Sequence, residues 1–262
     1  MNEQLSYLFE NDALSKMRNF IDNQTLFAFD LDGTLAPIAS KPSNIGIPDS
    51  IRQELTTLNE QAVVAVITGR SRSDALYHLG ISPRYLIGNH GAEGLPGWED
   101  RENEFVQIAN QWQSQLDILL PSNDRGGIMI ENKGATLSIH YRYVGNIKYA
   151  HKMILQTISK LNPQPRRIGG KFIENLIPTH APDKGIALRT LMEESGCQKG
   201  FFVGDDETDE DVFRLNDVNL FTVCVGRNAS SSARFYLWGQ SEILRFLRVI
   251  NCILNAKEKL AI

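Results

Sequence analysis

Long apolar runs are absent from this chain of 262 residues, and none approaches the roughly 18 residues that a membrane span requires. Basic charge is scarce as well, because 27 Lys and Arg are outnumbered by 31 Asp and Glu, which gives a formal net charge of −4. Proteins that bind nucleic acid through its phosphate backbone need a basic surface. We therefore expect neither a membrane nor a nucleic acid among the partners of this protein.

Cysteine is also rare in this chain. Cys197, Cys224 and Cys252 lie far apart, are odd in number and lack the spacing of a metal site. The first twelve residues carry several acids and no continuous apolar core, so they predict neither a signal peptide nor a transit peptide. These features are typical of a cytoplasmic protein with reduced thiols.

The chain does contain a regular alternation of short apolar runs and amphipathic stretches. An uninterrupted apolar run is typical of a parallel strand covered on both faces, and helices between such strands predict an α/β fold with a doubly wound, Rossmann-like parallel sheet. Ligands of such folds bind at the C-terminal ends of the strands. The predicted strands are 25–29, 62–67, 85–88, 200–204 and 220–225, and the predicted helices are 4–20, one beginning at Asp49, 71–79, 184–194, 209–215 and 243–254.

The pattern changes after Trp98 and returns to the first pattern near residue 179. The intervening block predicts helices at 101–120 and 146–161, strands at 127–131 and 135–142, and a strand pair over 166–176 that turns at Gly169-Gly170. We therefore expect a smaller α/β domain at 99–178, inserted between core segments 1–98 and 179–262.

Two acids follow the first predicted core strand. Asp30 and Asp32 are two residues apart, so they point the same way at a spacing of about 6–7 Å, and Gly33 lets the backbone turn sharply. Carboxylates so placed can share one phosphate and one metal ion. Taken alone, the same residues are equally typical of an ordinary Asp-Gly turn.

Polar residues also follow the other predicted core strands or begin a helix. Each group has a simpler interpretation as a helix cap, a structural histidine, an exposed lysine or a solvated helix start. The groups are Thr68-Gly69-Arg70, Asn89-His90-Gly91-Ala92-Glu93, Lys184-Gly185 and the acid-rich run 205–211.

Four of these motifs together resemble those of the haloacid dehalogenase superfamily of aspartate-nucleophile phosphatases, in that family's order. They are D-L-D-G-T-L from Asp30, I-T-G-R from Ile67, K-G at Lys184 and G-D-D-E-T-D-E from Gly204. G-N-H-G-A-E from Gly88, and Lys133-Gly134 followed by H-Y-R ending at Arg142, resemble the trehalose-6-phosphate phosphatase branch.

The resemblance implies a magnesium-dependent phosphatase that forms an aspartyl-phosphate. Asp30 would attack phosphorus, Asp32 would protonate the leaving oxygen with neighbouring acids favouring its protonated form, Thr68 would donate to phosphoryl oxygens and Lys184 would balance charge. Hard carboxylate ligands favour Mg²⁺. By resemblance, its ligands would be Asp30, the backbone carbonyl of Asp32, and Asp205, with Asp206 or Asp209 reaching it directly or through water.

Substrate contacts are expected at the strand tips and on one polar face of the inserted domain, where Ser138, His140 and Arg142 alternate along a predicted strand. A solvated sheet face is the alternative. The expected substrate-binding residues are Gly69, Arg70, Asn89, His90, Gly91, Glu93, Lys133, Ser138, His140, Arg142 and Asn175.

One segment departs from the family pattern of E-x-K/R-P before the catalytic lysine. This chain has Asn175-Leu176-Ile177-Pro178 there, and a slip of one residue to Glu174 would turn that side chain to the opposite face. The expected substrate is trehalose 6-phosphate. Alternatives are another glycosyl phosphate such as glucosylglycerol or sucrose phosphate, a phosphotransferase, or a non-catalytic sugar-phosphate-binding regulator. A separate sugar-phosphate synthase is the expected partner in the pathway.

Overall fold

The computed structural model describes residues 5–39, 44–120 and 126–261, and the chain divides into two compact units. The first comprises Met1–Gly91 and Asp183–Ile262, and the second comprises Ala92–Pro182. The second unit is wider at both ends than the inserted domain expected at 99–178. Each unit has its own sheet and its own apolar core.

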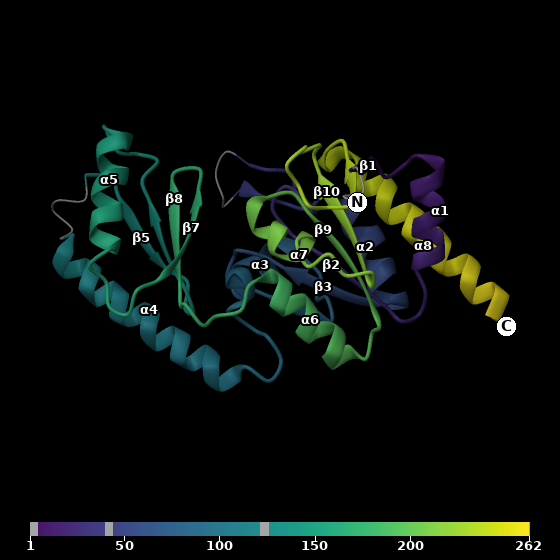
Figure 1. Cartoon of the computed structure of the whole chain (residues 1–262), viewed down its shortest axis with the longest axis horizontal. Coiled ribbons are helices and arrows are strands. Elements are labelled where there is room, and N and C mark those ends of the chain that lie inside the picture. The colour runs from purple at the N-terminus through teal and green to yellow at the C-terminus, as the bar shows by residue number, and fades with distance from the viewer. Residues whose placement is uncertain (1–4, 40–43, 121–125, 262) are drawn as a thin grey trace. The chain divides into compact units, whose positions relative to one another are not determined.

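The first unit is built on a seven-stranded sheet in which every neighbouring pair is parallel (Figure 1). From the central pair, the chain moves outward in both directions, so the strand order reverses between β2 and β9. This reversal is the topological switch point at which open α/β sheets bind their ligands. In spatial order the strands are β1 (Ser6–Tyr7), β11 (Phe235–Leu237), β10 (Leu220–Val225), β9 (Lys199–Gly204), β2 (Thr25–Phe29), β3 (Val63–Ile67) and β4 (Tyr85–Ile87).

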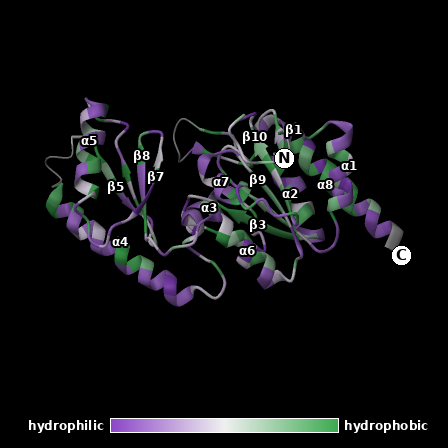
Figure 2. Ribbon diagram, in the orientation of Figure 1, coloured by the Kyte–Doolittle hydropathy of each residue, from purple (hydrophilic) through white to green (hydrophobic). Residues whose placement is uncertain are grey.

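Helices cover both faces of this sheet, which confirms the predicted doubly wound α/β fold. One face carries α1 (Asn11–Phe20), α2 (Asp49–Gln61), α3 (Arg72–Leu79) and α8 (Ile243–Ala261), whose apolar side chains pack with Phe27, Phe29 and Phe201 in one cluster. The other face carries α6 (Lys184–Ser195), which packs on β2, β3 and β9 and against the short α7 (Glu210–Phe213). Figure 2 shows the strands between these layers as mostly hydrophobic.

Two local predictions for the first unit were wrong. The helix expected over 4–20 begins only at Asn11, because Ser6 and Leu8 donate backbone hydrogen bonds to Arg234 and Tyr236 and so form the edge strand β1. The helix expected over 209–215 is shorter, with a 3₁₀ turn (η4, Glu207–Asp209) followed by α7. The strands β1 and β11, which lie next to each other at one side of the sheet, were not predicted.

The second unit is a four-stranded antiparallel sheet with two helices on one face. The strand order is β5 (Met129–Asn132), β6 (Leu137–His140), β8 (Ile173–Ile177) and β7 (Arg166–Gly170). Trp112 of α4 (Glu99–Leu119) and Ile154 of α5 (Ile147–Ile158) share a buried cluster with Leu137 and Ile139 of the sheet.

The turn predicted at Gly169-Gly170 lies elsewhere. Both glycines belong to β7 and pair with Glu174 and Ile173, and the chain reverses at Lys171-Phe172 instead. Phe172 adopts a positive φ of 66°, and its ring packs edge-on against Tyr141 at 6.2 Å between centroids. That packing holds a bulky residue in a backbone conformation that glycine would adopt more easily. Within the described part of the chain, no helix combines the length and apolar character of a membrane span.

Candidate active site

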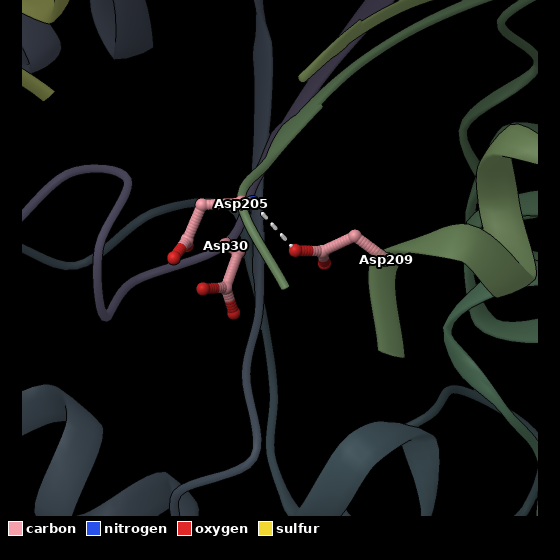
Figure 3. Close-up of side chains that lie close together, drawn as sticks. All are labelled: Asp30, Asp205 and Asp209. Carbon is pink, nitrogen blue, oxygen red and sulfur yellow. Dashed lines mark hydrogen bonds between the residues drawn. The ribbon is translucent and has the colours of Figure 1, made fainter. Parts of the chain in front are cut away.

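The central feature of the first unit is a cluster of acids where β2 and β9 end. Asp30 directly follows β2 and its backbone N–H donates to Val203 O at 2.9 Å, which continues the ladder between the two strands. Asp205 follows β9, and a 3₁₀ turn then carries Asp209. One carboxylate oxygen from each of these three acids lies within 4.8 Å of the others (Figure 3).

Lys184, the first residue of α6, is buried inside this cluster. Its Nζ donates to Asp30 Oδ1 and to Asp209 Oδ1, each at 2.8 Å, and its side chain is 1% exposed. Burial by itself lowers the pKa of Lys184, but the carboxylates of Asp209 and Asp30 outweigh it and raise that pKa well above its usual value. The lysine is therefore held as a cation between two acids.

The helix that carries this lysine, α6, is capped at both ends. Asp183 caps α6 by accepting a hydrogen bond from Ile186 N at 2.8 Å, and Gly196 ends the helix in the left-handed conformation. Asp30 and Ala28 lie on the α6 side of the sheet, opposite the cluster that contains Phe27 and Phe29. Strand alternation and the capped helix start thus bring Asp30 and Lys184 together.

Negative charge exceeds positive charge in this cluster. Burial, reinforced by the charges of Asp209 and Asp206, raises the pKa of Asp205 to about 7. Burial also raises the pKa of Asp209 to about 6, and that of Asp30 well above its usual value, even though Lys184 opposes both shifts. A divalent cation would relieve this repulsion, and a donor set made only of carboxylates suits a hard cation.

The three acids are not equivalent as ligands. Among the described residues, Asp30 accepts one hydrogen bond, from Lys184, and Asp205 accepts one, from Thr34 Oγ1 at 3.0 Å. Asp209 accepts three, from Lys184 and from the backbone N–H groups of Asp205 and Asp206 at 2.8 and 2.9 Å. Asp30 and Asp205 therefore have more capacity left for a metal ion than Asp209 has.

Asp206 lies outside the three-acid cluster, although the sequence placed it among the candidate metal ligands. Its carboxylate caps the 3₁₀ turn by accepting from Thr208 N at 2.8 Å and Thr208 Oγ1 at 2.6 Å. Burial raises its pKa, but Lys184 and the Thr208 hydrogen bonds outweigh burial and lower it overall. The local geometry thus gives Asp206 a capping role.

Asp32 pairs with a guanidinium and, among the described residues, does not belong to the three-acid cluster. Arg70 Nε donates to Asp32 Oδ2 at 2.6 Å and Nη2 to Oδ1 at 2.8 Å, while Nη1 donates to Asp74 Oδ2 at 2.6 Å. The sequence suggested that neighbouring acids would favour the protonated form of Asp32 and that Arg70 would contact substrate. In the structure all three guanidinium nitrogens donate to carboxylates, and the substrate contact stays a prediction.

The segments that follow β3 and β4 are joined by backbone hydrogen bonds. Thr68 is buried, its carbonyl accepts from His90 N at 2.9 Å, and Asn89 N donates to Arg70 O at 2.7 Å. Asn89 and His90 both have positive φ, 51° and 60°. A Cβ at Gly69 would lie 2.4 Å from the His90 ring, so the glycine of the I-T-G-R motif is required by the histidine of the next segment.

In the second unit, Ser138 and His140 share the sheet face opposite the helices, as the alternation predicts. Ser138 Oγ donates to Asn175 Oδ1 on the neighbouring strand at 2.7 Å, and His140 Nε2 is 2.7 Å from Glu131 Oε2. Lys133 lies on the turn between β5 and β6, where its N–H donates to Thr136 O.

Further polar residues of the second unit have other surroundings. Arg142 follows β6 and stacks over the Phe172 ring at 5.9 Å. Glu93 is half-buried near the start of the unit. Glu174 is buried on the helix side of the sheet, where it pairs with His151 at 2.8 Å and Arg167 at 3.0 Å. It therefore does not replace the glutamate of the family pattern, and Asn175 occupies the polar face.

Sequence reasoning missed Thr34 and Asp74. Thr34 belongs to the D-L-D-G-T-L motif, so its position beside the first acids was the available signal for its contact with Asp205. Asp74 carried no signal, because an acid in the first turn of a helix is common for reasons of the helix dipole alone.

Comparison with known proteins gives consistent matches. The family model described as trehalose-phosphatase matches residues 28–232. Trehalose-6-phosphate phosphatase of Escherichia coli (strain K12) is 31% identical over 240 residues, which cover 88% of each chain. Probable trehalose-phosphate phosphatase 4 of Oryza sativa subsp. japonica is 27% identical, and the match spans 83% of this chain but only 63% of the rice protein.

A solved structure of a trehalose-6-phosphate phosphatase related protein has the same fold. It superposes with a TM-score of 0.68 at 24% identity and covers 88% of this chain and 99% of its own. The family match and the Escherichia coli relative confirm the resemblance predicted from the motifs. The chain belongs to the trehalose-phosphatase family.

Proposed function

We propose that this protein is a magnesium-dependent phosphatase that hydrolyses trehalose 6-phosphate to trehalose and phosphate. The observation that carries this function is the buried Lys184 ammonium, which bridges Asp30 and Asp209 at the C-terminal edge of the parallel sheet. A buried cation beside an acid at a switch point is well placed to receive a phosphate dianion.

Magnesium would be held mainly by Asp30 and Asp205, together with the backbone carbonyl of Asp32. The fit is supported by the all-carboxylate donor set, and by the burial and neighbouring carboxylates that raise the pKa of Asp205 to about 7. Asp209, which already accepts hydrogen bonds from Lys184 and two backbone amides, would orient the lysine and the 205–206 backbone. A bound magnesium ion would neutralise charge on the transferring phosphoryl group.

In the proposed reaction, an Asp30 carboxylate oxygen forms a bond to phosphorus while the bond from phosphorus to the sugar oxygen breaks. Asp32 gives its proton to the leaving oxygen, and trehalose departs. Asp32 then takes a proton from a water molecule, whose oxygen attacks phosphorus and releases phosphate from Asp30. Lys184 and the Thr68 hydroxyl would bind the non-bridging oxygens through both steps.

Substrate recognition is assigned to the polar face of the second unit. Ser138 and Asn175 form a buried hydrogen-bonded pair there, with His140 and Glu131 beside them, and Lys133 and Arg142 on adjoining turns. Hydroxyl, amide and imidazole groups suit the hydroxyls of a sugar. Gly69, Asn89, His90, Gly91 and Glu93 are proposed to shape the phosphate end of the substrate site.

The choice of trehalose 6-phosphate is supported by the Escherichia coli relative, whose name states that substrate. Another glycosyl phosphate is the second candidate. It is favoured by one observation, because Asn175 pairs with Ser138 where the family pattern has a glutamate, and Glu174 lies on the other face. A change of polar group at such a position alters sugar preference.

Phosphate release over a panel of sugar phosphates tests the proposal. The panel contains trehalose 6-phosphate, sucrose 6-phosphate, glucosylglycerol phosphate and glucose 6-phosphate, each with magnesium and with a chelator. The expected result is the highest kcat/KM for trehalose 6-phosphate, loss of activity in chelator, and no turnover by Asp30→Asn. If another glycosyl phosphate gave the highest kcat/KM, that compound would be the substrate in place of trehalose 6-phosphate. Full turnover in chelator would overturn the metal dependence.

A further inference from the structure

Arg70 links two acidic side chains of the first unit, and a histidine lies beside the second of them. On one side its Nε and Nη2 hold both oxygens of Asp32, at 2.6 and 2.8 Å. On the other side its Nη1 donates to Asp74 Oδ2 at 2.6 Å, and Asp74 Oδ1 lies 3.4 Å from His78 Nε2. These contacts run from the carboxylate that follows β2 to the second turn of α3.

The contact between Arg70 and Asp32 fixes the plane of the carboxylate. Two parallel N–H donors of a planar guanidinium meet both oxygens of Asp32, and this fork geometry restricts rotation about the bond that carries the carboxyl group. Asp32 needs such restraint, because it lies on a turn beyond the strand and its side chain is 39% exposed. Without a partner it would sample several rotamers in solvent.

The position of Arg70 in turn depends on Asp74. The arginine lies in the segment between β3 and α3, and its side chain is only 11% exposed. Asp74 belongs to the first turn of α3, which Ser71 caps by accepting from Asp74 N. Asp74 therefore anchors the guanidinium to the first turn of α3.

Resting on the phosphatase function proposed for this chain, we propose that Asp74 is a positioning residue that, through Arg70, aims the Asp32 carboxyl group at the leaving-group oxygen. Arg70 itself serves Asp32 in this assignment and is not a substrate contact. The chemistry that depends on the alignment is the transfer of one proton from Asp32 to the departing oxygen. Small displacements of such a group lower the rate of transfer steeply.

The dependence of the rate on the leaving group separates positioning from a purely structural role. A phenolate that is stable as an anion leaves without a proton, whereas a poorer leaving group needs the aligned acid. We therefore compare kcat/KM for 4-nitrophenyl phosphate, phenyl phosphate and trehalose 6-phosphate. This quantity reports on steps up to the first departure and excludes the later hydrolysis of the aspartyl-phosphate.

In Asp74→Ala, kcat/KM should fall by about tenfold to a hundredfold for phenyl phosphate and trehalose 6-phosphate, and by no more than about twofold for 4-nitrophenyl phosphate. Arg70→Lys, which cannot make the two-pronged contact, should show the same selectivity. The matched control is Asp49→Asn, because Asp49 also pairs with an arginine in the first turn of a helix, at 2.8 Å, in the same unit. That control should leave all three substrates unchanged.

A double-mutant cycle completes the test. Once Asp32→Asn has removed the acid, adding Asp74→Ala should cause no further loss for phenyl phosphate, because both changes act through one group. Equal losses on all three substrates, no loss on any, or additive losses in the cycle would each overturn the positioning role. If the wild-type enzyme hydrolyses none of these esters, the proposed function fails, and the positioning role fails with it.

Discussion

Gly33 lies so close to Asp205 that a Cβ built at position 33 would stand 2.0 Å from Asp205 Oδ2. The glycine also has a φ of 84°, in the region that L side chains rarely adopt. Gly33→Ala should therefore displace the Asp205 carboxylate, with loss of nearly all phosphatase activity and of magnesium binding measured by calorimetry. The backbone strain alone should lower the free energy of unfolding by about 1–2 kcal/mol.

Gly97→Ala is the control that isolates the backbone effect. Gly97 has a similar φ of 76°, and nothing lies within 4 Å of the Cβ it would gain. Its substitution should reproduce the strain and spare the activity. If Gly33→Ala retained wild-type magnesium binding, the close approach of Gly33 to Asp205 would not be needed for metal binding.

Thr34 should raise the affinity of Asp205 for magnesium by orienting its carboxylate. Its hydroxyl donates to Asp205 Oδ1 at 3.0 Å, and side chains that orient a ligand typically contribute about tenfold to a hundredfold to metal affinity. Thr34→Val, which keeps the shape and removes the donor, should raise the magnesium concentration for half-maximal activity by about that factor. Thr34→Ser should restore it. Equal magnesium dependence in all three proteins would contradict this role.

Without magnesium, the stability of the protein should fall as pH rises. The pKa of Asp205 is about 7 in the folded protein and 3.8 in its unperturbed state, so between these values the folded state binds more protons than the unfolded chain. Urea unfolding in chelator should thus give a free energy of unfolding that is lower at pH 8 than at pH 5, by on the order of a few kcal/mol.

The matched experiments use magnesium and Asp205→Asn. A bound dication favours the charged carboxylate, so saturating magnesium should reduce the slope, and the neutral amide should reduce it as well. A stability of the chelated protein that rises from pH 5 to pH 8 would show that Asp205 is not the group that dominates this range.

The second unit should contribute to sugar selectivity through Lys133. This residue lies on the turn between β5 and β6, next to the strand that carries Ser138 and His140. Lys133→Ala should lower kcat/KM for trehalose 6-phosphate by about tenfold to a few hundredfold, as for a lost hydrogen bond to a charged group, and should spare 4-nitrophenyl phosphate. Lys171→Ala, on the other turn of the same sheet, is the control. Equal losses on both substrates would show that Lys133 does not contact the sugar and that the sugar site lies elsewhere.

The central strands and their tips could be predicted because each strand is a continuous apolar run that ends in a polar motif. Residues 25–29 and 220–225 were predicted with the bounds that the structure has. The strands Ser6–Tyr7 and Phe235–Leu237 were missed, since each is too short to show a period. Gly169 and Gly170 misled the turn prediction, because glycine permits a turn without requiring one.

Within the site, the residue types were predictable and several partners were not. Asp206 and Asp209 are acids three residues apart, and the sequence does not show that Asp206 caps the 3₁₀ turn while Asp209 pairs with Lys184. Arg70 and Asp32 are 38 residues apart, and no local pattern indicates that they meet. Contacts of that kind depend on how strands are ordered in the sheet, which spacing along the chain does not encode.

The first unit is assembled from two stretches of chain that the second unit separates, and this arrangement bears on how the protein folds. Lys184 and Asp30 are 154 residues apart, and β2 and β9 are direct neighbours in the sheet. During synthesis, the β2 edge that will receive β9 therefore stays unpaired while the whole insertion emerges from the ribosome. Non-local closure of this kind slows folding and leaves a long-lived exposed strand edge. Expression at low temperature, or with more chaperone, should therefore raise the yield of soluble protein.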